Sequence, residues 1–347
     1  MMSPRISGLA IALMAITGAM ALALLGLWCA GFAPLDVITT WCVGACGSSI
    51  RIALSLQEAG PLLLTGLAVA TAFRCGVLNI GGEGQFLAGA AGFTAAAVLL
   101  PASSLALVIA LLFGTMIGAG WAGIAAALAQ WRNVPVVLST ILLNIIAVAL
   151  LGALVEGPLR DPLTSAPQSA LLSDAYFLPV LVHGTRLHLG VALAGVLALL
   201  IWLVHARSQL GFELLVVGLN PETARRVGIP VSARQMQVLL LSGGFAGLAG
   251  AMQVAGVTHF LSAATTSYGY AGIAVALLGR LHPVGIIAAA IFMGMLDTGG
   301  RACEKQLGVP HEVGDIIKGL MVLGVLLAAG WAVRRQALMR RREASDA

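Results

Sequence analysis

Charged side chains are scarce in this chain of 347 residues, of which only 10% are charged while 59% are hydrophobic. A soluble globular domain carries about 25% charged residues, because much of its folded surface faces water. A water-soluble fold of this length could not hide so much apolar surface. The composition therefore argues against soluble enzymes, nucleic-acid binders and disordered chains, and it indicates a protein that crosses a membrane several times.

Several catalytic signatures are missing as well. The only lysines are Lys305 and Lys318, and neither lies in the G-x-x-x-x-G-K-S/T loop that holds nucleotide phosphates. The sequence also lacks the H-E-x-x-H helix of zinc proteases and the G-x-S-x-G turn of serine hydrolases. We therefore expect no enzyme activity in this chain, no catalytic residue, no metal site and no cofactor.

The cysteines show no metal-type spacing. Cys42 and Cys46 are four residues apart and could meet on one helix face, but a disulfide between them requires an oxidising compartment. Small apolar packing residues are the simpler interpretation of all five, which are Cys29, Cys42, Cys46, Cys75 and Cys303.

Continuous apolar runs dominate what is present. They are about 20 residues long, the length at which an α-helix crosses a hydrocarbon core about 30 Å thick, whereas a membrane β-barrel would show strict alternation. We predict an all-α fold, a polytopic transmembrane helical bundle of about ten membrane segments (roughly eight to ten), broken helices included. Full-length spans are expected at about 7–32, 54–73, 86–100, 105–129, 134–155, 189–204, 236–257 and 313–333, with shorter pieces at 268–279 and 284–296.

Arginine placement predicts the orientation, because positively charged loops stay in the cytoplasm. Arginines are concentrated in the loop 205–235 and in the tail 334–347, whereas the polar loop 156–188 carries more acids than arginines. We predict a cytoplasmic loop at 205–235, a basic cytoplasmic tail at 334–347 that contacts membrane lipid, and an external loop at 156–188. Both termini are then cytoplasmic, and the net charge of +5 requires no nucleic-acid partner.

One polar, glycine-rich segment, residues 79–85, interrupts the apolar runs. Glycine weakens a helix by about 1 kcal/mol relative to alanine, and a charged group costs at least about 2.5–3.5 kcal/mol at the membrane centre. Such a segment persists only if it is buried in protein or lines a wet cavity, as helix breaks in transporters do. We predict that Asn79, Glu83 and Gln85 line a solute path. A plain cytoplasmic turn is the alternative, in which Glu83 caps a helix or pairs with Arg74.

A second motif lies in the loop 205–235 and contains both start and stop signals for a helix. It combines an N-cap, a proline at N1, an acid in the first turn, two arginines in the last turn and a glycine after the end. The residues are Asn220, Pro221, Glu222, Arg225, Arg226 and Gly228. A helix of about seven residues is not stable alone in water, so we predict that it docks on a partner. A decoration of the loop surface is the alternative.

Four segments together resemble a known family, the membrane permease subunits of ABC importers of the branched-chain amino acid, ribose and nucleoside type. The segment 78–85 is similar to the NIGxEGQ signature of the nucleoside or simple-sugar branch. The segment 218–229 resembles the coupling loop, and 137–144 and 267–280 resemble two further family motifs. The resemblance covers residues of about 54–335.

The chain departs from the family pattern at two positions. Val136 stands where the resemblance implies an acidic residue, and Gly82 stands where alanine is commoner. Segments 79–85 and 267–280 are candidates for equivalent parts of two internal, inverted halves.

The resemblance implies a division of labour within a prokaryotic plasma (inner) membrane. An extracytoplasmic solute-binding protein would capture the solute, and this chain, as a single permease domain over 1–347, would form the path with a second permease, identical or homologous. Cytoplasmic ATPase subunits would dock on the coupling loop and supply the energy. Few charges in the spans favour a neutral polar solute, most of all a nucleoside or related sugar.

Three further residues are candidates for the substrate path, each with an alternative role. Tyr268 and Tyr270 could stack on a base or sugar, or they could be interfacial aromatics. Asn144 lies deep in a span, where bridging helices is the favoured interpretation and solute contact the second.

Glu58 and Asp297 keep open an ion-driven secondary transporter, and a membrane scaffold is the non-transport alternative.

Overall fold

The chain is helical nearly throughout in the computed structural model. The structure describes residues 31–262 and 267–310, together with 17, 18, 21, 24–29, 312–317, 319, 320, 323, 324 and 327. These residues contain no β-strand, only three isolated bridges, so the all-α prediction is confirmed. The predicted tail 334–347 and most of the first and last predicted spans lie outside the described residues.

Six of the described helices are long and apolar enough to cross a membrane, which confirms a multi-pass helical protein. They are α3 (Ser49–Arg74), α5 (Ser104–Arg132), α6 (Val136–Glu156), α7 (Leu189–Arg207), α10 (Val231–Gln253) with its π-helical end η2 (Val254–Thr258), and α12 (Pro283–Leu307). The shorter elements are α2 (Pro34–Cys46), α4 (Gly82–Leu99), η1 (Asp174–Tyr176), α8 (Gln209–Leu219), α9 (Pro221–Arg226) and α11 (Tyr268–Leu278). The number of spans, eight to ten, stays a prediction.

The chain forms two compact units. The first contains residues up to Arg51 and those from Leu296 onward, and the second contains Ile52–Met295. In the first unit the indole Nε1 of Trp41 on α2 donates to the carbonyl of Leu296, with 3.4 Å between the two atoms. Cys303 lies in the apolar core of this unit, which agrees with its interpretation as a packing residue.

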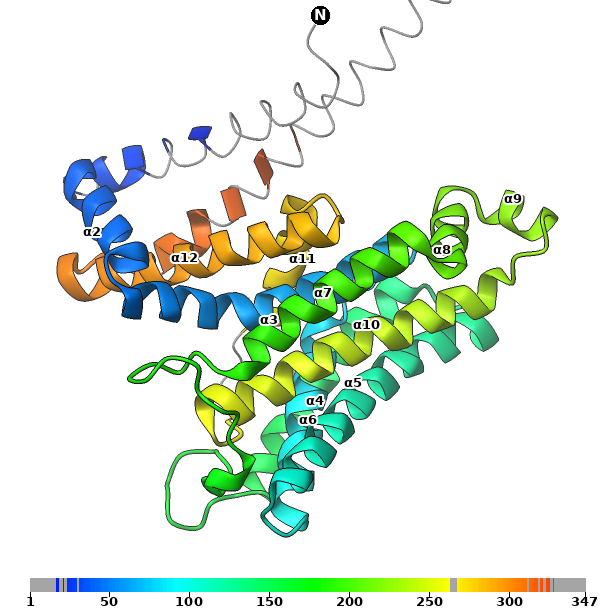
Figure 1. Cartoon of the computed structure of the whole chain (residues 1–347), viewed down its shortest axis with the longest axis horizontal. Coiled ribbons are helices and arrows are strands. Elements are labelled where there is room, and N and C mark those ends of the chain that lie inside the picture. Colours follow the sequence, from blue (N-terminus) through cyan, green and yellow to red (C-terminus); the bar gives the residue numbers. More distant parts are fainter. Residues whose placement is uncertain are drawn as a thin grey trace, which may run out of the picture. The chain divides into compact units, whose positions relative to one another are not determined.

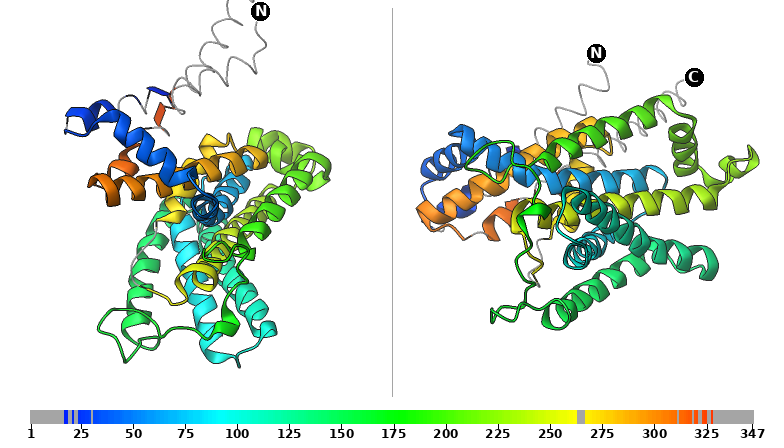
Figure 2. Two further views of the ribbon diagram at one scale, coloured as in Figure 1. Left: turned by 60° about the vertical axis from the view of Figure 1, so that its left-hand side comes forward. Right: turned by 60° about the horizontal axis from the view of Figure 1, so that its bottom comes forward.

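The second unit is built on three tightly packed helices, α4, α5 and α10, of which α5 runs along α10 while α4 crosses them (Figures 1 and 2). Their backbones meet at glycines. A Cβ added to Gly89 of α4 would overlap the backbone of Gly247 on α10, and one added to Gly118 of α5 would lie 2.5 Å from the Cα of Gly247. Small residues at such crossings let membrane helices pack backbone to backbone.

The structure corrects the predicted loop 205–235. This segment contains α8 and α9, and α10 begins at Val231, several residues before the predicted span at 236. Arg234, which suggested a loop by its charge, lies in the first turn of α10, where its Nε donates to Glu213 of α8 over 2.6 Å. Arg234 was predicted to lie in the loop, whereas it forms an ion pair that joins α10 to α8. Similarly, α12 continues to Leu307, beyond the predicted apolar piece at 284–296.

The segment between α6 and α7 is largely irregular and is attached to the end of α10. The backbone N–H of Leu172 donates to the carbonyl of His259, and that of Leu178 donates to the carbonyl of Ala255. The ring of Phe177 stacks on that of His259, with 3.7 Å between their centroids. These contacts hold the segment over η2.

Candidate functional site

The predicted break at 79–85 is a turn between α3 and α4. Gly76 turns the chain in the left-handed region (φ +74°), and α4 begins at Gly82. The segment is therefore a turn, as in the alternative prediction, but its polar side chains are not on the surface. Asn79, Glu83 and Gln85 are each only 1% exposed. Burial within protein is one of the two conditions under which such polar residues persist in a membrane protein.

The first part of the site is a hydrogen-bonded pair of amides. Asn79 and Gln85 bond to each other twice, at 3.0 and 3.1 Å between their amide nitrogens and oxygens. The Nδ2 of Asn79 also donates to the Oγ of Ser242 on α10 at 2.8 Å, and Ser242 donates to the carbonyl of Ala68 on α3 at 2.7 Å. The pair therefore ties α3, α4 and α10 together.

Asn144 of α6 forms the second part. Its Oδ1 accepts from the backbone N–H of Gly84 at 2.8 Å, and its Nδ2 donates to the carbonyl of Ile80 at 3.0 Å. The same Nδ2 lies 3.3 Å from the phenol oxygen of Tyr270 on α11. Asn144 therefore bridges helices, as expected from its depth in the span, and it does so at the signature segment itself.

Two carboxylates from different helices reach the first turn of α11. The Oε2 of Glu83 accepts from the backbone N–H of Gly269 at 2.9 Å, and the Oε2 of Glu58 on α3 accepts from the hydroxyl of Tyr268 at 2.6 Å. The starts of α4 and α11 are in backbone contact, because a Cβ on Gly269 would overlap the backbone of Glu83. A carboxylate suits this position, since helix N-termini carry partial positive charge.

The structure thus brings all six predicted path residues into one connected group, to which it adds Glu58 and Ser242. We call this group the signature cluster; it consists of Glu58, Asn79, Glu83, Gln85, Asn144, Ser242, Tyr268 and Tyr270. Tyr270 is the open member, with 47% of its surface exposed. Sequence reasoning noted Glu58 only as a membrane acid, and a serine such as Ser242 gives no local signal among apolar neighbours.

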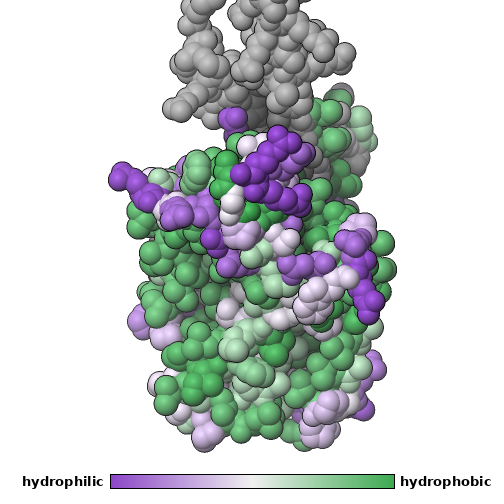
Figure 3. Space-filling view, turned by 90° about the vertical axis from the view of Figure 1, so that its right-hand side faces the viewer, coloured by the Kyte–Doolittle hydropathy of each residue, from purple (hydrophilic) through white to green (hydrophobic). Residues whose placement is uncertain are grey.

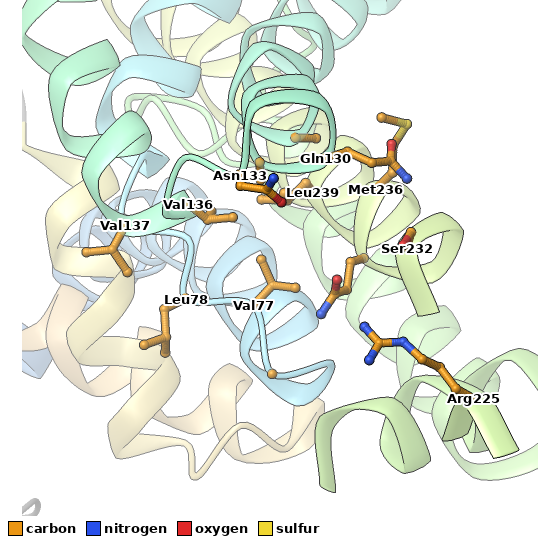
Figure 4. A pocket seen from close by; sticks show the side chains of 14 residues that line it. Val77, Leu78, Gln130, Asn133, Val136, Val137, Arg225, Ser232, Met236 and Leu239 are labelled. Carbon is orange, nitrogen blue, oxygen red and sulfur yellow. The ribbon is translucent and has the colours of Figure 1, made fainter. Parts of the chain in front are cut away.

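A cavity of about 450 Å³ lies beside the signature cluster, between the end of α5 and the starts of α6 and α10 (Figure 4). Its lining residues are Gly76, Val77, Leu78, Ala126, Ala129, Gln130, Asn133, Val136, Val137, Arg225, Ser232, Gln235, Met236 and Leu239. Arg225, on α9, is the only charged residue among them. Hydrophilic residues interrupt the otherwise largely hydrophobic surface on the side that carries α9 (Figure 3).

Helix α9 has the start that its sequence predicts. The Oδ1 of Asn220 accepts from the backbone N–H groups of Glu222 and Thr223 at 3.0 and 3.1 Å, and Pro221 is the first helical residue. Gly228 lies past the end in the left-handed region, at φ +83°. The helix has six residues, close to the predicted seven.

The two arginines of α9 differ in their surroundings. Arg226 pairs with Glu222 at 2.8 Å on the exposed face, whereas Arg225 lines the cavity. The helix is anchored by Ala224, which is fully buried against Val217 of α8 and Val231 of α10. Because α9 is fixed by its neighbours, its short length does not prevent it from being ordered.

Burial also affects ionisable groups near the ends of the spans. Burial raises the pKa of the Cys75 thiol, which follows α3, to about 11, and the charge of Arg234 opposes this shift. The thiol is therefore uncharged near pH 7 and unreactive, in agreement with a packing role.

Comparison with known proteins gives a consistent result. Residues 51–326 match the family described as branched-chain amino acid transport system, permease component. The glucose ABC transporter permease protein TsgB13 of Haloferax volcanii is 35% identical over 327 residues, covering 90% of this chain and 86% of the relative. The guanosine ABC transporter permease protein NupP of Bacillus subtilis is 35% identical over 340 residues, or 96% and 97% of the two chains. The nucleoside ABC transporter permease protein NupB of Lactococcus lactis is 29% identical, covering 84% and 83%.

Proposed function

Because this chain belongs to the branched-chain amino acid transport permease family, we propose that it forms the path by which an ATP-driven importer moves a small neutral polar solute. A nucleoside or related sugar is the leading solute class. Relatives named for guanosine, nucleosides and glucose support this class, since each covers more than four fifths of the chain. The family resemblance predicted from the sequence is confirmed by these matches.

The observation that carries the proposal is the convergence of α3, α4, α6, α10 and α11 at the signature cluster. Five helices exchange buried hydrogen bonds there, and the starts of α4 and α11 meet. Helix ends that meet inside a membrane protein are where transporters handle polar solutes. In the proposal the signature cluster is one wall of the path, and Tyr270 presents its exposed ring to the solute.

The electrostatics of the signature cluster argue against an anionic solute. The carboxylates of Glu58 and Glu83 each accept a hydrogen bond from the start of α11, so they serve as internal counter-charges to that helix end. An anionic solute would meet two carboxylates at this wall.

The remaining partners follow from the family and from α9. We place the ATPase subunits against α9, whose exposed Asn220, Glu222 and Arg226 side chains stand clear of the helices that anchor it. The second permease completes the path, and a solute-binding protein delivers the solute on the side of the segment 157–188. The N- and C-terminal ends lie in the cytoplasm in this arrangement, and ATP hydrolysis takes place in the separate subunits.

Uptake into proteoliposomes that contain the complete transporter tests this function. Labelled guanosine and glucose are offered with the solute-binding protein, and uptake is measured with internal ATP, without ATP, and with ATP plus an ionophore that collapses ion gradients. We expect ATP-dependent uptake of one of these solutes that is insensitive to the ionophore. Uptake that persists without ATP and stops with the ionophore would establish the ion-driven alternative instead.

A further inference from the structure

Several residues that line the cavity are close in sequence to residues of the signature cluster. Val77 and Leu78 immediately precede Asn79, Leu239 is one helical turn from Ser242, and Val136 is one turn before Thr140. A Cβ added to Gly81, within the signature segment, would lie 2.9 Å from the Cβ of Thr140. Two walls of the cavity, residues 76–78 and α10, therefore come within about one helical turn of the signature cluster, and the α6 wall reaches Asn144 about two turns further on. The cavity and the signature cluster are thus neighbours along the same helices, and α9 contributes Arg225 to the cavity.

The lining has the chemistry of a small-molecule site. Apolar side chains form most of it, and four neutral hydrogen-bonding side chains are added from α10 and from the end of α5: Gln130, Asn133, Ser232 and Gln235. None of these four side chains makes a hydrogen bond to another described residue, so their polar groups are available to a ligand. Sites for small ligands combine apolar walls with a few polar groups in this way.

The volume fits the same interpretation. The cavity measures about 450 Å³, within the range of about 300–1,000 Å³ that is usual for small-molecule pockets. Amide and hydroxyl groups that line the walls can donate to and accept from the hydroxyls or ring nitrogens of a neutral solute. The apolar side chains of Val77, Val136 and Leu239 match a flat ring.

From this arrangement we propose that the cavity is a second solute site, on the α9 side of the signature cluster, that binds the transported solute before its release. The ligand class is a neutral solute with one apolar ring face and several hydrogen-bonding groups, as in a nucleoside. Gln235 and Asn133 bind its polar edge, and Val136 packs on its ring. This inference rests on the proposed function and adds a specific site to it.

A segment of the ATPase inserted into the cavity is the competing occupant. Two observations favour the solute. The cavity is built partly on the same turn and helices as the signature cluster, namely residues 76–78, α6 and α10, which an ATPase contact does not require. In addition, α9 contributes only Arg225 to the lining, whereas its exposed residues Glu222 and Arg226, which we assign to the ATPase, lie outside it.

Binding of labelled guanosine and labelled glucose to the membrane complex of permeases and ATPases in lipid nanodiscs tests the site. The solute-binding protein is left out, because it would itself bind the probe. Val136→Trp fills the cavity, and its matched control is Leu138→Trp, at a position that is 52% exposed and does not line the cavity. We expect the wild-type complex to bind one probe, Val136→Trp to weaken that binding by at least about tenfold, and Leu138→Trp to leave it unchanged.

A second pair of variants makes smaller changes, so that the test does not depend on correct folding of Val136→Trp. Gln235→Met keeps the size of the side chain but removes its hydrogen-bonding groups, and Gln237→Met makes the same change outside the lining. Loss of a neutral hydrogen bond weakens binding about two- to tenfold, so we expect that range for Gln235→Met and no change for Gln237→Met.

Several results would overturn the second site. The first is equal binding by the wild type, Val136→Trp and Gln235→Met. The second is failure of the wild-type complex to bind either probe. The third is loss of the ATPase subunits from the Val136→Trp complex, which would make the cavity an ATPase contact. Failure of the proposed function is distinguishable, because it appears as absence of ATP-dependent uptake by the wild-type transporter. Normal wild-type uptake together with equal binding by all variants rejects the second site alone.

Discussion

The carboxylate of Glu83, one residue after the start of α4, accepts a hydrogen bond from the backbone N–H of Gly269, in the first turn of α11, at 2.9 Å. The two residues are 186 positions apart in the chain, and this bond joins the two glycine-rich segments that the sequence singled out. A buried hydrogen bond to a charged group contributes about 1.5–3 kcal/mol.

Replacing Glu83 separates the role of its hydrogen bond from that of its charge. Glu83→Gln keeps an acceptor oxygen for Gly269 and should leave the thermal unfolding of the purified transporter nearly unchanged while it alters the uptake rate. Glu83→Ala leaves the N–H of Gly269 unpaired and should destabilise the protein by about 1–3 kcal/mol. Glu222→Gln is the control for the unfolding measurement alone, since its pair with Arg226 is exposed and contributes less than about 1 kcal/mol. A wild-type uptake rate for Glu83→Gln would remove the charge of Glu83 from the path.

Gly269 is required where the starts of α4 and α11 touch. A methyl group at this position would overlap the backbone of Glu83, so Gly269→Ala should push the two helices apart. We expect a loss of about 1–3 kcal/mol in stability, as for overpacking in general, together with a large fall in uptake. The matched control is Gly120→Ala in α5, where a Cβ meets nothing within 4 Å and should stabilise the helix slightly. Equal behaviour of the two variants would mean that α11 adjusts freely.

The N-cap of α9 provides a test of the proposed ATPase contact. Asn220→Ala removes the acceptor of two backbone hydrogen bonds and should destabilise α9 by about 1 kcal/mol. We expect lower solute-stimulated ATP hydrolysis and weaker co-purification of the ATPase subunits, with insertion into the membrane unchanged. Asn220→Asp preserves the cap and should restore both measurements. Full coupling in Asn220→Ala would argue that α9 is a decoration of the loop.

Acid should weaken the segment attached over η2, because of two histidines at its edge. Burial lowers the pKa of His188 to about 4, with a further lowering by His259, so the buried ring is neutral in the folded protein. The pKa of His259 is lowered too, first by burial and then by Arg186, while Asp174 acts in the opposite direction. The unfolded chain takes up a proton near pH 6.5, so stability should be constant above that pH and fall between about 6.5 and 4.

Thermal unfolding of the transporter across this pH range measures the effect. His188→Leu removes the buried titrating group and should give a shallower fall of stability with acid. An equally steep fall in His188→Leu would assign the acid sensitivity to other groups.

The sequence predicted most of the helices because apolar runs of spanning length leave few alternatives. It also predicted that the segment 79–85 is either buried in protein or lines a wet cavity and that Asn220 begins a helix, since both depend on local chemistry. The contact between Glu58 and Tyr268 could not be predicted, because it joins residues 210 positions apart on helices whose packing is not encoded locally. The same applies to the cavity, to which four separated segments each contribute a few ordinary side chains.

The errors have a physical explanation. Arg234 was predicted to lie in a loop, although a helix that projects beyond the apolar layer carries charges without ending. The pairing of Arg234 with Glu213 makes such a projection stable. Hydropathy indicates which residues of a helix lie in the lipid layer. A helix can continue beyond that layer, so the end of an apolar run does not mark the end of the helix.

The glycine crossings of α4, α5 and α10 limit how this protein can move. Where Gly89, Gly118 and Gly247 bring the backbones together, no layer of flexible side chains lies between them to absorb a sliding motion. The three helices must therefore travel as a single rigid block through any transport cycle. Rearrangement is left to the helices that contact this block through side chains, whereas α11, whose Gly269 meets the backbone of Glu83, is coupled to the block at its start.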